Sequence, residues 1–92
     1  MDYASSQLFN TTFAVTAGAT RVNTGFINYP IAFPVGKTLF GIANIINGAS
    51  TADQWTARWV PQDNTRFALL LFCPGGAPAN VSLGINVHVF VL

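Results

Sequence analysis

The stretch that decides the fold is the C-terminal run V-S-L-G-I-N-V-H-V-F-V-L, from Val81 to Leu92. Its odd positions all carry β-branched or aliphatic side chains, whereas its even positions are mixed. Because side chains alternate between the two faces of a strand, the odd positions predict one buried face and the even positions, which include Asn86 and His88, predict the other. We therefore expect a C-terminal strand that is held inside a sheet.

Further segments of strand character precede this run, and turn signals separate them. The expected strands cover residues 9–15, 21–27, 38–47, 54–60 and 65–73. Pro61-Gln62-Asp63-Asn64 indicates a hairpin turn, residues 74–78 indicate a loop, and no apolar pattern persists at helical spacing. About six short strands in one small chain predict an all-β fold, a small antiparallel β-sandwich.

The composition suggests that part of this sandwich is covered by another molecule. Of the 92 residues, 51% are hydrophobic and only 8% are charged, where about 25% is usual for a soluble domain. The expected strands at 38–47 and 67–73 are apolar on both faces, yet a two-layer sandwich has one interior. Either the N-terminal segment shields the second faces or identical chains do so around a symmetry axis. The second explanation also accounts for the low charge, and we expect an oligomer.

Several functional classes are excluded by what the sequence lacks. The apolar runs are shorter than the roughly 20 residues of a membrane-spanning helix, and Met1 is followed by Asp2 and polar residues rather than by a signal peptide. A net charge of +1 gives no basic patch for nucleic acid. The single cysteine, Cys73, cannot form an internal disulfide, and we expect it to be a small buried hydrophobe.

No catalytic or metal-binding constellation is present, so we expect no enzyme and no cofactor. His88 has no partner at metal-ligand spacing, and Cys73 has no nearby cation to activate it. The three carboxylates, Asp2, Asp53 and Asp63, fall in a tail or in loops, where the rigid spacing of a glycosidase pair is not expected.

Saccharide binding is the chemistry that the polar residues favour. It needs an aromatic ring together with planar polar groups, and the segment from Asp53 to Arg58 contains both. The candidate ligand-binding residues are Asp53, Gln54, Trp55, Arg58, Asn86 and His88. The last two join the site if the final strand neighbours residues 54–60. Trp55 and Trp59 lie on the opposite face from Arg58, so the alternative that both are core residues stays open.

Three parts of the chain together resemble a known class of proteins. The run G-F-I-N-Y-P-I-A-F-P at Gly25–Pro34, a strand at residues 39–46 and the closing strand at 85–91 resemble the C-terminal tip domains of bacteriophage tail fibres. The same features are similar to the H-type lectin domain. The resemblance covers residues 21–92 and implies a β-sandwich tip domain, assembled as a homotrimer at the distal end of a virion fibre. Its implied function is non-enzymatic recognition of host cell-surface saccharides.

The N-terminal residues 1–20 lie outside this resemblance, and we expect them to link to a shaft or to pack on a neighbouring subunit. Two other functional interpretations remain. One is a structural virion or capsid-decoration protein that uses the same sheet surfaces for assembly and binds no ligand. The other is a free lectin-like module outside any virus.

Overall fold

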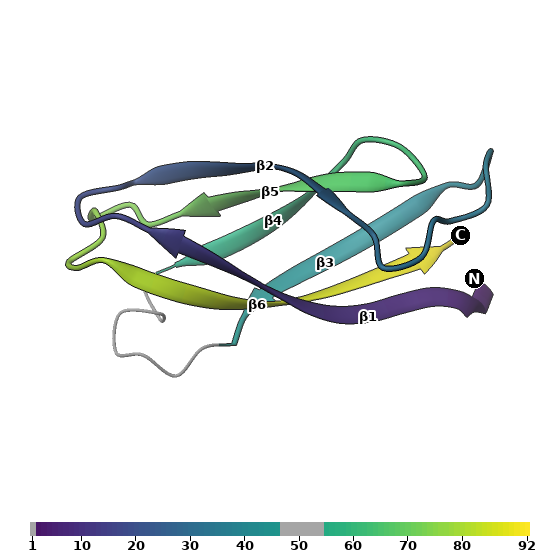
Figure 1. The fold of residues 1–92 in the computed structure, drawn as a ribbon, viewed down its shortest axis with the longest axis horizontal. Coiled ribbons are helices and arrows are strands. Elements are labelled where there is room, and N and C mark those ends of the chain that lie inside the picture. Colours follow the sequence, from purple (N-terminus) through teal and green to yellow (C-terminus); the bar gives the residue numbers. More distant parts are fainter. Residues whose placement is uncertain (1, 47–54) are drawn as a thin grey trace.

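The protein is a sandwich of two antiparallel three-stranded sheets, seen in a computed structural model that describes residues 2–46 and 55–92. Sheet A has the strand order β1-β6-β3, and sheet B has the order β2-β5-β4 (Figure 1). The strands are β1 (Asp2–Val15), β2 (Arg21–Asn28), β3 (Leu39–Ile45), β4 (Thr56–Pro61), β5 (Arg66–Phe72) and β6 (Val81–Val91). This architecture confirms the predicted all-β sandwich. No helix in the described ranges is long and apolar enough to span a membrane.

The C-terminal strand β6 is the centre of sheet A, with β1 on one side and β3 on the other. The odd positions from Leu83 to Val89 are fully buried, and Val91 is almost so. Because β6 has a partner on both sides, its backbone groups are satisfied and its odd side chains face the opposing sheet. The alternation that predicted this strand is therefore confirmed.

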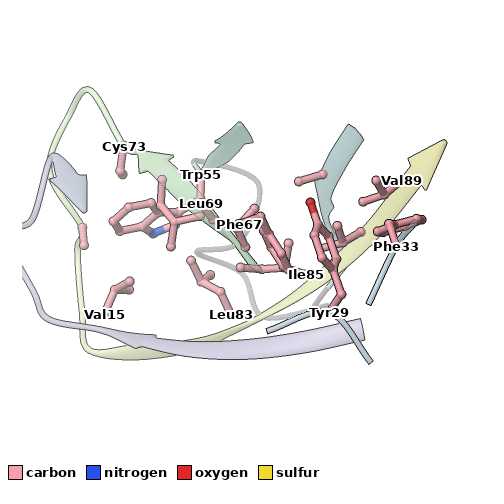
Figure 2. Packing of buried hydrophobic residues seen from close by; sticks show 14 of the residues in the cluster. Val15, Tyr29, Phe33, Trp55, Phe67, Leu69, Cys73, Leu83, Ile85 and Val89 are labelled. Atoms are coloured by element: carbon pink, nitrogen blue, oxygen red, sulfur yellow. The ribbon is translucent and has the colours of Figure 1, made fainter. Parts of the chain in front are cut away.

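Strand β5 has the corresponding place in sheet B, between β2 and β4. Its inward side chains, Phe67, Leu69 and Leu71, have no exposed surface and pack against those of β6 across the interior (Figure 2). Cys73 follows directly and is buried with a free thiol, as predicted. The core is thus formed by two apolar central strands, each flanked by two edge strands.

The two strands that were expected to be apolar on both faces differ in how their outer faces are covered. On β5, Leu70 is partly covered, and its cross-strand neighbours are Asn23 and Arg58. Long polar side chains can cover apolar surface in this way. On β3, by contrast, Phe40 and Ile42 remain 49% and 43% exposed. Within one chain, β3 therefore keeps the larger bare face.

The N-terminal strand belongs to the same sandwich as the rest of the chain. Phe9 lies opposite Val87 and Phe13 lies opposite Leu83 in the register of β1 with β6. Both aromatic side chains pack against the core. Residues 2–15 therefore complete sheet A, and the N-terminal segment does not form a unit of its own.

The proline-bounded segment crosses from sheet B to sheet A, between β2 and β3. Tyr29 and Phe33 are its buried anchors, and their backbone N–H groups donate to the carbonyl oxygens of Thr65 and Asn64 at 2.9 and 2.8 Å. The rings of Tyr29 and Phe67 stack with centroids 4.9 Å apart. Because proline cannot donate to a ladder, a crossover is a place where these residues are tolerated.

Candidate functional site

The candidate residues of the sequence-predicted site do not form one surface. Asn86 and His88 point outward from sheet A, whereas Arg58 points outward from sheet B. The condition under which Asn86 and His88 would join Arg58, that the final strand neighbours residues 54–60, is not met, because β6 pairs with β1 and β3 while β4 pairs with β5. The two halves of the predicted site are therefore on opposite faces of the sandwich.

Trp55 is a core residue and is inaccessible as a sugar-stacking ring. Its side chain is only 3% exposed and lies in the cluster that includes Leu69 and Cys73 (Figure 2). The indole Nε1 is buried and has no hydrogen-bond partner among the described residues. The large apolar surface of Trp55 fills the interior, which is the core alternative that the sequence left open for this residue. Asp53 and Gln54 lie outside the described residues.

A groove of about 430 Å³ runs between the edge strands β3 and β4, where the two sheets meet. Residues 40–43 of β3 form one wall, and Ala57, Arg58, Trp59 and Pro61 of β4 form the other. Of the predicted ligand residues that the structure describes, Arg58 alone lies here. Its neighbours on the wall include the exposed ring of Phe40 and the partly buried ring of Trp59.

The floor of this groove depends on a glycine. A Cβ placed on Gly41 would overlap the indole ring of Trp59, so that ring rests against the bare backbone of β3. Its Nε1 donates to the Tyr29 hydroxyl oxygen at 3.2 Å. Burial raises the pKa of Tyr29, although this hydrogen bond partly opposes the shift. The sequence signal was the glycine inside a strand, which indicates a close approach of another group.

A second hollow of about 360 Å³ adjoins the first, because Pro61 lines both. Its lining is polar and includes Lys37, Gln62, Asp63 and Asn64. It lies beside the β4–β5 hairpin turn that the sequence predicted. We refer to the two hollows together as the β4 groove.

Asp63 holds the turn beside the β4 groove. Its Oδ1 accepts hydrogen bonds from the Thr65 hydroxyl at 2.7 Å, the Thr65 N–H at 2.8 Å and the Arg66 N–H at 3.0 Å. Hydrogen bonds from the hydroxyl and N–H of Thr65 are the main reason that the pKa of Asp63 is lowered. Its other oxygen, Oδ2, lies 3.6 Å from Arg66 Nε.

The β4 groove is lined by Arg58 and Lys37, which are available for an anionic group, whereas Arg66 lies outside it. Arg66 pairs with Asp63 and lies over the Phe26 ring at 4.5 Å. Arg58 and Lys37, however, have no carboxylate partner among the described residues. An exposed ring, a guanidinium and a set of amide and carboxylate oxygens are the chemistry of a shallow site for a polar, partly anionic ligand.

The outer face of sheet A, which holds the other two predicted residues, is chemically different. His88 lies between Leu8 and Ile42 in the register, and its ring is 4.0 Å from that of Phe90. Asn86 donates from Nδ2 to Asn10 Oδ1 at 3.0 Å. This surface is a sheet face whose described side chains include no Lys, Arg, Asp or Glu from residue 6 onward, and on which apolar side chains alternate with asparagines and other uncharged polar groups.

The fold is shared with solved structures of tail fibres. An N-truncated R1-type pyocin tail fibre matches with a TM-score of 0.63 and 17% identity, over 92% of this chain and 69% of that one. A C-terminal fragment of the Pseudomonas aeruginosa R1 pyocin fibre matches with a TM-score of 0.62 and 17% identity. That match covers 92% of this chain and 22% of the fragment, so the chain spans about a fifth of the longer structure.

Comparisons of sequence alone add no relative. No protein-family model matches the chain, and no curated protein matches it at a significant level. At 17% identity the likeness to the pyocin fibres shows a common fold. The chain is therefore a β-sandwich with the fold found in R1 pyocin tail fibres.

Proposed function

We propose that this protein is a non-enzymatic receptor-binding module of a phage-type tail fibre, which recognises a host cell-surface saccharide as a homotrimer. The observation that carries the proposal is the fold shared with R1 pyocin tail fibres over 92% of the chain. A module of this kind acts at the distal end of a virion tail fibre and needs neither metal nor cofactor. The H-type lectin resemblance adds the expectation that the ligand is a sugar.

The saccharide site of this proposal is the β4 groove. The exposed Phe40 ring offers an apolar surface for a sugar ring, and Arg58 offers a fork of donors for an anionic or phosphorylated substituent. Gln62 and Asn64 line the adjoining hollow and supply amide groups for hydroxyls. The groove is shallow, so each site is expected to be weak, with a Kd on the order of 1 mM. Adhesion then depends on several sites that engage together.

The proposal is tested with purified protein on an array of immobilised bacterial lipopolysaccharides and capsular polysaccharides, and on whole bacterial cells. The parent protein is expected to bind at least one anionic polysaccharide. Arg58→Ala is expected to reduce that binding about tenfold or more, since a lost charged hydrogen bond costs about 1.5–3 kcal/mol. Its melting temperature should stay close to that of the parent because the side chain is exposed.

Arg21→Ala is the matched control. Arg21 is also exposed on the outer face of sheet B, yet it lies on β2 and is not part of the groove. Arg21→Ala removes the same charge as Arg58→Ala, so a general electrostatic effect would weaken the polysaccharide binding of both variants equally. If both variants bind as the parent does, the site is elsewhere. A parent that binds no polysaccharide and no cells would favour the structural virion protein instead.

A further inference from the structure

We propose that the outer face of sheet A is the surface through which copies of this chain assemble, so that Asn86 and His88 are subunit contacts rather than saccharide ligands. The inference rests on the proposed homotrimer and adds which face is covered. The central strand β6 then lies nearest the symmetry axis, and the β4 groove borders the interface, because Phe40 and Ile42 belong to the covered face and also line the groove.

The first support is the apolar surface that one chain leaves bare on this face. Leu8 is 64% exposed, and Phe40 and Ile42 on β3 are 49% and 43% exposed. Phe90 lies opposite Phe40 in the register, with ring centroids 6.5 Å apart. These side chains come from all three strands, with His88 between Leu8 and Ile42 in the register, and such a group of exposed apolar side chains on one face is typical of an interaction surface.

The second support is the distribution of charge between the two outer faces. From residue 6 onward, the described side chains on the outer face of sheet A include no Lys, Arg, Asp or Glu. Sheet B instead places Arg21, Arg58 and Arg66 on its outer face. Two copies of sheet B would bring arginines against arginines, whereas two copies of sheet A meet without repulsion or unpaired charge. A copy of this chain is therefore the occupant that the neutral face fits.

The third support is a row of asparagines across the same face. Asn10, Asn86 and Asn44 occupy one register line on the three strands. Each side-chain amide is both donor and acceptor, so the row can pair with the same row of a neighbouring copy. Such a row satisfies its polar groups and also sets the axial alignment, as a core asparagine does in a coiled coil.

The size of the face is sufficient for a specific interface. The longest uninterrupted strand, β6, has 11 residues. The edge strand β3 is shorter, with 7 residues, so three strands about 4.8 Å apart give a flat face of roughly 450 Å² per chain. In a closed trimer the three faces together cover roughly 1,400 Å², compared with the roughly 1,000 Å² needed for a specific assembly.

The experiment measures mass by light scattering after size exclusion, with folding followed by circular dichroism. The variants are Leu8→Asp and Ile42→Asp on the proposed interface. Phe26→Asp is the matched control, because Phe26 is 58% exposed on the outer face of sheet B. The parent and Phe26→Asp are expected at about three times the chain mass of 9.8 kDa. The two interface variants are expected to fall about threefold in mass while retaining strand signal.

A cysteine variant gives a second measurement that does not depend on dissociation. Asn86→Cys is expected to form a disulfide between chains under mild oxidation, whereas Asn23→Cys on sheet B is expected to remain a single chain on a denaturing gel. The native Cys73 is buried and does not compete. If the parent is an oligomer, if Leu8→Asp and Ile42→Asp keep its mass and if Asn86→Cys forms no crosslink, the interface is not the outer face of sheet A. That result would leave the proposed trimer unaffected. A monomeric parent overturns the trimer as well, and dissociation by Phe26→Asp moves the interface to sheet B.

Discussion

The indole ring of Trp59 lies directly against the backbone of Gly41, at the place where the two sheets approach each other. Trp59 is on the edge strand of sheet B and Gly41 is on the edge strand of sheet A. The absence of a side chain on one strand thus makes room for the largest side chain on the other. This contact closes one side of the sandwich and forms the floor of the β4 groove.

Gly41→Ala is expected to destabilise the protein by about 1–3 kcal/mol, since an added methyl group in a filled space forces the indole or the strand to move. Urea denaturation gives the change in the free energy of unfolding. Gly75→Ala is the control, because a Cβ on Gly75 meets no atom within 4 Å and its backbone angle is ordinary. That control is expected to change stability by less than about 0.5 kcal/mol. Equal effects of the two substitutions would contradict the close contact.

Tyr29→Phe is expected to cost about 0.5–1.5 kcal/mol, because it removes the acceptor of the Trp59 Nε1 hydrogen bond. The substitution keeps the ring, which stacks on Phe67 and meets Phe33 edge-on at 4.8 Å. The loss therefore isolates the hydroxyl group. Thermal and urea unfolding of the parent and of Tyr29→Phe measure this loss of stability. An unchanged unfolding midpoint would show that water replaces the hydroxyl group without a loss of stability.

Trp55→Ala is expected to destabilise the sandwich by about 3–5 kcal/mol, because it leaves a cavity in the core. For a small domain this is a large share of the total stability. Any loss of cell adsorption should therefore accompany a lower melting temperature, unlike the loss expected for Arg58→Ala. A Trp55→Ala protein that melts like the parent but fails to adsorb would instead restore Trp55 as a ligand residue.

Stability is expected to fall in acid partly through Asp63. The pKa of Asp63 in the folded protein is below its ordinary value of 3.8, so the carboxylate stabilises the fold above the unfolded pKa. This contribution disappears as the pH falls through the folded pKa. Asp63→Asn keeps a carbonyl acceptor but does not titrate. The difference in unfolding midpoint between the parent and Asp63→Asn should therefore shrink between neutral pH and about pH 3, and a constant difference would show that the turn does not depend on the charge.

Local sequence patterns were enough to predict where most strands lie and which of their side chains point inward. The alternation of residues 81–91 identifies the inward side chains of β6, and the turn residues at Pro61–Asn64 identify the β4–β5 hairpin, since both signals are local. The sequence also predicted that Cys73 is buried. Because side chains alternate between the two faces of a strand, the sequence pattern alone indicates on which face each side chain lies.

The neighbours of each strand, and with them the residues of the candidate site, followed from the folded arrangement and not from local patterns. Alternation assigns Arg58 and His88 to the outer faces of their strands, but it does not say that these strands belong to different sheets. It likewise could not tell that Trp55 fills the core or that Trp59 meets Gly41 at the edge. Strand pairing and packing between sheets join residues far apart in the chain, and their energies depend on how all six strands fit together. The separation of a neutral face from an arginine-bearing one is a consequence of that pairing.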